Sequence, residues 1–215
     1  MHRPAAVILD MDGVVVDSEP RHERAFLEVM QALGYADRHG LRFADYVGVS
    51  DQKLWADFVA RHRPKHSAAE LLALKRERLL ALLRRERPLF PGVPQLLAQL
   101  AARYPLALAS GSERLVVEEV LRLGGLGPFF AAVVTDTEVP RGKPVPDIFL
   151  RAAELLGVAP ARCCVIEDSK PGVAAGRAAG MFVIAITNTH PAAELRQADR
   201  VVRSYAEIGR LLLGT

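Results

Sequence analysis

The segment Ile8-Leu9-Asp10-Met11-Asp12-Gly13-Val14-Val15-Val16-Asp17 places two carboxylates directly after an apolar run. An ordinary strand ends in a turn residue, whereas two carboxylates one residue apart repel each other and resist the loss of water. A cation or a proton is needed to compensate such a pair in a buried position. Asp10 and Asp12 therefore indicate a functional site at the end of a buried strand.

The length and composition of the chain are those of a well-packed globular protein. Its 215 residues, half of them apolar, can form one sizeable domain or a core domain with a smaller insertion. No run of ~18 or more uncharged apolar residues occurs, so we expect no membrane span. The charged residue Asp10 ends the opening apolar run, which is too short for the apolar core of a secretory signal. We expect a cytoplasmic protein that is a monomer or a weak dimer.

The formal net charge of +3 is unevenly distributed along the chain. Residues 19–88 hold 14 Lys and Arg against 10 Asp and Glu. A basic region can attract an anionic substrate or a nucleic acid, but a solvated helical surface is the commoner cause. The densest basic cluster, residues 61–66, has no interleaved aromatic side chains. We therefore do not expect nucleic-acid binding.

The only two cysteines, Cys163 and Cys164, are adjacent within an apolar run. Successive side chains of a strand point to opposite faces, so we expect no disulfide between them. We predict two small core residues rather than a redox or metal site.

Short apolar runs alternate with helical segments from Pro88 onward, and the opening run belongs to the same pattern. The predicted strands are 5–9, 105–109, 131–135, 163–166, 182–186 and 201–202. The predicted helices of this region are 93–102, 113–123, 146–156, 172–179, 192–197 and 205–213. Continuous apolar runs are typical of strands buried on both faces. The alternation predicts an α/β fold, a Rossmann-like parallel sheet with helices on both faces.

About seventy residues separate the first predicted strand from the second, and apolar residues recur there at helical spacing. Ser50 and Ser67 are candidate N-caps of two helices in this segment. We predict an inserted α-helical cap domain of residues 19–88. The core domain would then consist of residues 1–18 and 89–215.

Polar residues follow the predicted strands at the edge where parallel sheets bind ligands. In chain order they are Asp10 and Asp12, Ser110-Gly111-Ser112, Gly142-Lys143-Pro144, and Glu167-Asp168-Ser169. Mg²⁺ prefers hard oxygen ligands, lysine acts as a point charge on phosphate, and small residues let backbone amides approach anions. Taken alone, Asp168 could instead cap the following helix. Together these residues predict a site for a divalent metal and a phosphoryl group.

The chain resembles the haloacid dehalogenase-like hydrolases in four segments that have the order and spacing of the family motifs. These segments are DMDGVVVDSEP (10–20), LALASGS (106–112), GKPVPDIF (142–149) and VIEDSKPGV (165–173). The helical insertion resembles the family's helical cap. The similarity is greatest to the subgroup of β-phosphoglucomutase, phosphoglycolate phosphatase and sugar-phosphate phosphatases, and it spans essentially the whole chain.

The resemblance implies Mg²⁺-dependent phosphoryl transfer through an aspartyl-phosphate. Asp10 would be the nucleophile. Asp12 would be the general acid and base, and it would carry a proton near neutral pH because Asp10 repels its charge. Mg²⁺ would be held by Asp10, the backbone carbonyl of Asp12, and Asp168. Glu167 would bind the metal directly or from its outer shell.

The same resemblance assigns the phosphate contacts. Ser110 and the nearby amides of Gly111 and Ser112 would hold phosphate oxygens, and Lys143 would neutralise the aspartates and the transferring group. Gly13 would allow a tight turn beside the phosphate. Dehalogenases of the superfamily have no aspartate at the position of Asp12, so that residue favours phosphoryl transfer.

The cap would decide between a phosphatase and a mutase. In the mutases a basic residue follows a Gly-Val-Ser-type turn and binds a second phosphate, whereas here Asp51 follows Gly48-Val49-Ser50. This departure favours a phosphatase acting on a small phosphorylated metabolite, a sugar or polyol monophosphate.

Several alternatives stay open at this point. His22 lies where the mutases have a histidine that assists the second aspartate, which keeps a β-phosphoglucomutase-type activity open, although an exposed helix histidine would look the same. Lys75 and Arg76 are candidates to reach the cleft from the cap. A noncatalytic binding protein of the same fold is disfavoured because all four motifs are intact.

Overall fold

The computed structural model describes residues 3–214, so that residues 1–2 and 215, at the ends of the expected core domain, lie outside the described residues. Its centre is a parallel sheet in the order β3-β2-β1-β4-β5-β6. The strands are β1 (Ala6–Leu9), β2 (Leu106–Ser110), β3 (Ala132–Thr135), β4 (Cys163–Glu167), β5 (Phe182–Ile186) and β6 (Arg200–Val202). Each strand end lies within one residue of the sequence-based prediction. The predicted α/β fold is confirmed.

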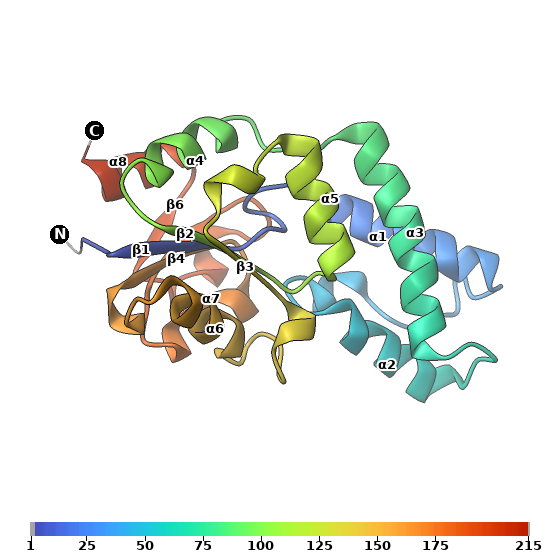
Figure 1. Ribbon diagram of the computed structural model, residues 1–215. Helices are drawn as coiled ribbons and strands as arrows, with labels where there is room; N and C mark the ends of the chain where they lie inside the picture. The colour runs from blue at the N-terminus through green and yellow to red at the C-terminus, as the bar shows by residue number, and fades with distance from the viewer. Residues whose placement is uncertain (1–2, 215) are drawn as a thin grey trace.

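Two apolar cores lie on the two faces of the sheet because strand side chains alternate. The flanking helices are α4 (Val93–Ala101), α5 (Arg114–Gly124), α6 (Asp147–Leu156), α7 (Lys170–Ala178) and α8 (Tyr205–Leu213). Val7 and Leu9 pack in the core with α4, α5 and α8, whereas Ala6 and Ile8 pack with α6 and α7. Figure 1 shows the first three helices above the sheet and the other two below it.

The two cysteines confirm this alternation. Cys163 lies in the core with α6 and α7, and Cys164 lies in the opposite core. Both are buried and free, and burial raises the pKa of Cys163 to about 11. They are core residues without a disulfide, as the strand periodicity predicts.

The central strand β1 lies between β2 and β4, where Leu9 pairs with Leu108 on one side and Ile166 on the other. Since all pairings are parallel, the residues after these strands emerge at one edge of the sheet. Asp10, Ser110 and Asp168 thereby come together from positions far apart in the chain.

A separate helical unit follows β1. It consists of α1 (Glu19–Ala32), α2 (Asp51–His62) and α3 (Ala68–Glu86). Its own apolar cluster, centred on Phe26, Trp55 and Phe58, is distinct from the two cores of the sheet. Figure 1 shows this unit beside the sheet, with α3 near α5. No helix in residues 3–214 is both long and apolar enough to cross a membrane.

The remaining elements are short 3₁₀ turns. They are η1 (Phe43–Tyr46), η2 (Gly127–Phe129), η3 (Asp136–Glu138), η4 (Pro160–Arg162) and η5 (Ala192–Glu194). The helix predicted over 192–197 is therefore wrong, because only the turn η5 forms there. Leu195 is the only buried residue of that segment, and one apolar contact does not provide the stripe that holds a helix on a core.

A tight turn follows β1 and leads toward α1. The Gly13 amide donates to the Val16 carbonyl at 2.8 Å, and Val14, Val15 and Val16 are buried. Gly13 has a φ of +75°, and a Cβ there would lie 1.8 Å from Oδ2 of Asp168. Only glycine fits, for both reasons.

The two predicted N-caps of the helical unit provide a stability test. Ser67 forms a capping box with Glu70, whereas Ser50 precedes α2 without a side-chain capping bond. We expect Ser67→Ala to lower the free energy of unfolding by about 1 kcal/mol, because an amide and a carboxylate lose their partners. Ser50→Ala is the control, with a smaller loss. Thermal unfolding followed by circular dichroism checks this, and equal losses in the two variants would contradict it.

Candidate active site

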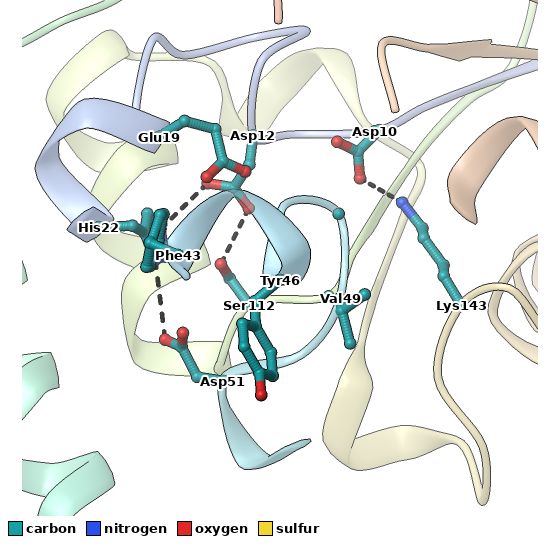
Figure 2. A pocket seen from close by; sticks show the side chains of 12 residues that line it. Asp10, Asp12, Glu19, His22, Phe43, Tyr46, Val49, Asp51, Ser112 and Lys143 are labelled. Carbon is teal, nitrogen blue, oxygen red and sulfur yellow. Dashed lines mark hydrogen bonds and ion pairs between the residues drawn. The ribbon is translucent and has the colours of Figure 1, made fainter. Parts of the chain in front are cut away.

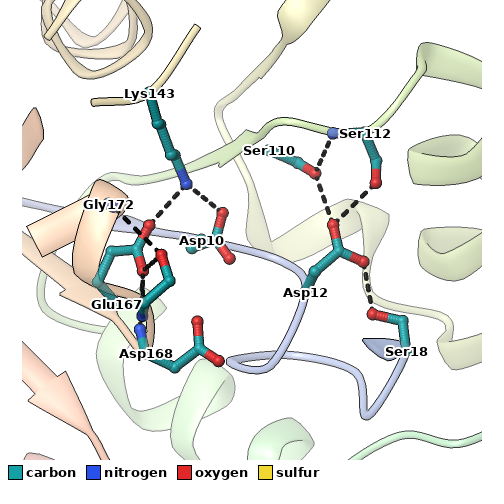
Figure 3. A network of polar contacts seen from close by, with 10 residues as sticks. Asp10, Asp12, Ser18, Ser110, Ser112, Lys143, Glu167, Asp168 and Gly172 are labelled. Atoms are coloured by element: carbon teal, nitrogen blue, oxygen red, sulfur yellow. Dashed lines mark hydrogen bonds and ion pairs between the residues drawn. The ribbon is translucent and has the colours of Figure 1, made fainter. Parts of the chain in front are cut away.

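The carboxyl ends of β1, β2 and β4 bring the sequence-predicted polar residues into one buried network (Figure 3). Asp10 follows β1, Ser110 ends β2, and Glu167 ends β4. Lys143 reaches them from the loop before α6. All four side chains are buried, so the charges of Asp10, Glu167 and Lys143 have to be balanced within the protein.

Lys143 is the cation that the opening pair of aspartates requires. Its Nζ donates to Oδ1 of Asp10 at 2.5 Å and to Oε1 of Glu167 at 2.6 Å. The ammonium also lies 5.0 Å from the centre of the Phe149 ring. Burial opposes the charge, but Asp10 and Glu167 outweigh it and raise the pKa of Lys143 above its ordinary value.

Three carboxylates, Asp10, Glu167 and Asp168, lie close enough to hold a metal ion, with one oxygen of each within 4.8 Å of the others. Burial raises the pKa of Asp10 well above its ordinary value, against the charge of Lys143. Burial and the charges of Glu167 and Asp10 also raise the pKa of Asp168 well above its ordinary value. Lys143 alone therefore leaves negative charge uncompensated. Buried carboxylate oxygens in excess fit a divalent cation such as Mg²⁺.

Glu167 is already well supplied with hydrogen-bond donors. Besides Lys143, its oxygens accept from the amides of Asp168 and Ser169 at 2.8 and 2.9 Å and from the Ser169 hydroxyl at 2.9 Å. A Cβ on Gly172 would lie 1.6 Å from Oε1 of Glu167, so glycine is required where α7 approaches it. Glu167 thus orients Lys143 and the following loop. The N-cap of α7 is Ser169 rather than Asp168, which leaves the Asp168 carboxylate for the site.

Asp12 lies outside the carboxylate cluster and is surrounded by hydroxyls. Its carboxylate accepts from Ser18 at 2.5 Å, Ser112 at 2.9 Å and Ser110 at 3.1 Å. Burial opposes its ionisation, but His22 and the hydroxyls outweigh burial and lower the pKa of Asp12 to about 2. The expectation that Asp12 itself carries a proton is contradicted, because these donors act more strongly than repulsion by Asp10.

His22 connects Asp12 to the helical unit (Figure 2). Its Nε2 lies 3.4 Å from Oδ1 of Asp12, and its Nδ1 lies 3.0 Å from Nζ of Lys75. An ammonium donates only to an unprotonated Nδ1, so a hydrogen bond with Lys75 would require a neutral ring, whereas the raised pKa of His22 favours the protonated one. Protonation would turn Nδ1 into a donor for Oδ2 of Asp51, 3.7 Å away. Burial and Lys75 oppose protonation, but Asp12 and Asp51 outweigh them and raise the pKa of His22 to about 9.

The space enclosed between the sheet edge and the helical unit is a cavity of about 30 Å³. Its lining residues are Asp10, Asp12, Glu19, His22, Phe43, Tyr46, Gly48, Val49, Asp51, Gly111, Ser112 and Lys143. A single water occupies about 30 Å³ in the liquid, so this cavity is closed to larger molecules. Gly111 and Ser112 line it as the sequence predicts, whereas Ser110 lies behind them on Asp12.

Several lining residues were not predicted from the sequence. Glu19, Phe43 and Tyr46 are not part of any strand end, and no local pattern distinguishes them from other helix residues. Burial raises the pKa of Glu19 to about 7, against the charge of His22. Asn188 was also missed: its side chain donates to the Gly13 carbonyl at 2.7 Å and supports the turn after Asp12. Its place just after β5 was the only available signal.

Lys75 and Arg76 do not line the cavity. Lys75 is completely buried and pairs with Asp51, while Arg76 pairs with Glu113 of the sheet domain at 2.9 Å. Arg84 forms a second such pair with Glu119 at 2.8 Å. Arg76 therefore holds the helical unit against the segment that begins α5, and Lys75 acts through its neighbours.

Comparisons with known proteins show the family to which this chain belongs. The family model of the haloacid dehalogenase-like hydrolases matches residues 4–180. The chain belongs to this family. Hexitol phosphatase B of Escherichia coli K12 is 33% identical over 209 residues, which cover 96% of this chain and 92% of that protein. β-Phosphoglucomutase of Bacillus subtilis is 32% identical over 216 residues, covering 97% and 93%.

A solved structure extends the similarity to the whole fold of this hydrolase. CbbY from Rhodobacter sphaeroides, in complex with xylulose-(1,5)bisphosphate, superposes with a TM-score of 0.85 and 29% identity. The superposition covers 96% of each chain. The fold predicted from the four motifs is therefore the fold of solved members of the family.

Gly48 provides a test of whether activity depends on the closed position of the helical unit. A Cβ on Gly48 would lie 2.5 Å from Oγ of Ser169 in the sheet domain, and its φ is +77°. We expect Gly48→Ala to keep the unit from closing and to lower the hydrolase kcat/KM by about 10²-fold, since misplacement by 1 Å can cost that much. Small-angle scattering should show a larger radius of gyration.

Gly34→Ala is the matched control, because Gly34 has a φ of +76° and a Cβ there would have nothing within 4 Å. Both substitutions carry the same backbone strain, so only the contact with Ser169 differs. Equal activities of the two variants would contradict the closed contact.

Proposed function

We propose that this hydrolase is a Mg²⁺-dependent phosphatase that acts on a small sugar or polyol phosphate through an aspartyl-phosphate. The observation that carries the proposal is that the two aspartates after β1 are buried in different surroundings. Asp10 lies among Lys143, Glu167 and Asp168, and Asp12 lies among hydroxyls and His22. These different surroundings support attack on phosphorus by Asp10 and proton transfer by Asp12.

The metal site would be formed by Asp10, Asp168 and the backbone carbonyl of Asp12, with Glu167 orienting the group from outside. The excess of buried carboxylate oxygens supports this assignment. When bound, the ion supplies positive charge for the phosphoryl oxygens. Lys143 supplies a second positive charge from the side of Asp10.

Asp10 attacks phosphorus, forms an O–P bond and displaces the leaving oxygen. This covalent route divides one difficult transfer into two easier steps. The leaving oxygen takes a proton from Asp12, which receives it from Nε2 of the protonated His22 ring, 3.4 Å away, so that the ring becomes neutral. Asp12 then removes a proton from water and returns it to Nε2 of His22, while the resulting hydroxide attacks phosphorus, breaks the O–P bond to Asp10 and releases phosphate. Ser112 and the amides near Gly111 would hold phosphate oxygens.

Residues 19–88 act in this proposal as a cap domain over a core of residues 1–18 and 89–215. A phosphorylated sugar cannot enter a cavity of about 30 Å³, so the cap has to open before substrate binds. Closure then excludes water and brings His22 to Asp12. The contacts of Arg76 with Glu113 and of Gly48 with Ser169 are the ones that opening breaks.

The relatives support a sugar or polyol phosphate as the substrate class, because hexitol phosphatase B matches nearly the whole chain. The second candidate is a phosphoglucomutase, which His22 and the Bacillus subtilis relative favour. Asp51 opposes it, because a carboxylate occupies the position where a mutase needs a cation for a second phosphate.

Phosphate release tests the phosphatase directly. We expect turnover of hexitol phosphates or fructose 1-phosphate with Mg²⁺, its loss with chelator, and its return when Mg²⁺ is restored. Asp10→Asn should lower kcat by on the order of 10³-fold or more, because the amide is no nucleophile. The exposed Asp37 provides the control Asp37→Asn, with unchanged turnover. Intact-protein mass after acid quenching should detect one phosphoryl group on the wild type.

Either of two results would refute this mechanism: turnover that persists in chelator, or turnover that survives Asp10→Asn. Cooperative thermal unfolding of the variant, even at a lower temperature than for the wild type, shows that it is folded.

A separate assay distinguishes phosphatase from mutase. The protein is incubated with β-glucose 1-phosphate and a trace of glucose 1,6-bisphosphate, and the products are resolved by chromatography. We expect free glucose and inorganic phosphate, since no cation of the cap is available for a second phosphate. Glucose 6-phosphate as the main product would establish the mutase instead.

A further inference from the structure

We propose that Asp51, held by Lys75, determines specificity by accepting hydrogen bonds from the unphosphorylated end of the substrate. The pair selects an uncharged, hydroxyl-bearing end and excludes a second phosphate. This inference rests on the proposed phosphatase function and specifies which sugar or polyol phosphates it takes.

Asp51 lies at the start of α2 and lines the cavity from the helical unit, whereas Asp10 lines it from the sheet (Figure 2). Its side chain is only 20% exposed, and it is one of the residues that line the cavity. A substrate whose phosphate lies at Asp10 therefore directs its other end toward the helical unit, where Asp51 is located.

The two oxygens of Asp51 have different surroundings. Oδ1 pairs with Nζ of Lys75. Oδ2 forms an ion-pair contact of 3.7 Å with Nδ1 of His22. A carboxylate oxygen has two lone pairs, so Oδ2 keeps acceptor capacity for a second partner beside the cavity. Hydrogen bonds from a neutral donor to a carboxylate are short and strong, so a substrate hydroxyl is a suitable partner.

The cations near the cavity are already committed to other groups. Among the described lining residues, only His22 and Lys143 can carry positive charge. Lys143 is bound by Asp10 and Glu167, and His22 faces Asp12. Lys75 is completely buried behind Asp51. A second phosphate would therefore meet acceptor-only oxygens and the carboxylate of Glu19, without a side-chain cation to replace its water.

The pairing with Lys75 also argues against a cationic substrate. Asp51 and Lys75 together carry no net charge, so an ammonium group gains little attraction from them. Phe43, Tyr46 and Val49 line the same side of the cavity and offer apolar contact to a carbon chain. The Asp51–Lys75 pair has no net charge, still accepts hydrogen bonds and lies beside an apolar surface. It therefore fits the hydroxyl-bearing chain of a polyol or sugar.

The test compares three substrates on the wild-type protein with Mg²⁺: fructose 1-phosphate, fructose 1,6-bisphosphate and acetyl phosphate. We expect kcat/KM for the monophosphate to exceed that for the bisphosphate by at least about 100-fold, in the range that unpaired buried polar groups produce. Acetyl phosphate has no distal hydroxyls and reports the chemistry at Asp10 alone.

Variants of Asp51 locate the source of the preference. We expect Asp51→Asn to reduce the ratio of monophosphate to bisphosphate kcat/KM by at least about 10-fold, because the amide can donate to a phosphate. Asp51→Glu, which keeps the carboxylate, should retain most of the ratio. Asp37→Asn changes an exposed carboxylate of the same unit and should leave all three substrates unaffected.

Asp51→Asn leaves the charge of Lys75 buried without its partner, which can unfold the helical unit. The double variant Asp51→Asn with Lys75→Met removes both charges and is measured in parallel. Because the ratio compares two substrates on one protein, a general loss of activity does not change it. The double variant should show the same reduced ratio.

The inference is overturned if the wild type hydrolyses the bisphosphate as well as the monophosphate, or if neither Asp51→Asn nor the double variant with Lys75→Met changes their ratio. Hydrolysis of acetyl phosphate in the same assay then shows that the phosphatase function itself holds. If no substrate is hydrolysed, acetyl phosphate included, the proposed function fails and the inference fails with it.

Discussion

The ion pair of Lys143 with Asp10 and Glu167 is the interaction on which the rest of this site depends. Three carboxylates are buried at one sheet edge, and a buried charge without a partner costs several kcal/mol or more. Lys143 compensates two of them at 2.5 and 2.6 Å. This requires β1 to lie between β2 and β4, because only that order brings Asp10 beside Glu167 while the loop before α6 remains within reach.

The two aspartates of the opening segment are one residue apart yet have opposite properties. Burial raises the pKa of Asp10, whereas His22 and the hydroxyls lower the pKa of Asp12 to about 2. The chain path after the strand separates them: one turns toward the carboxylate cluster and the other toward the helical unit. The carboxylate cluster of Asp10 thus lies on one side of the site, and Asp12 with His22 lies on the other.

The helical unit contributes what the sheet cannot supply. His22 and Asp51 face the sheet edge across the cavity, and Lys75 lies behind them and contacts both. In the proposed mechanism the sheet domain supplies Asp10, and the helical unit supplies the residues on the opposite side of the cavity. Arg76 pairs with Glu113 and Gly48 approaches Ser169, and these contacts hold the unit against the sheet domain.

Much of the fold and of the candidate site could be predicted from the sequence, because both follow from strong local patterns of apolar and polar residues. Apolar runs determined every strand to within one residue, and the polar residues after them determined which side chains meet at the sheet edge. The ionisation of Asp12, the pairing of Lys75 with Asp51, and the presence of Glu19 and Asn188 at the site were decided only by the tertiary structure. Each depends on distances between side chains from elements far apart in the chain, and those distances arise only when the helical unit packs against the sheet.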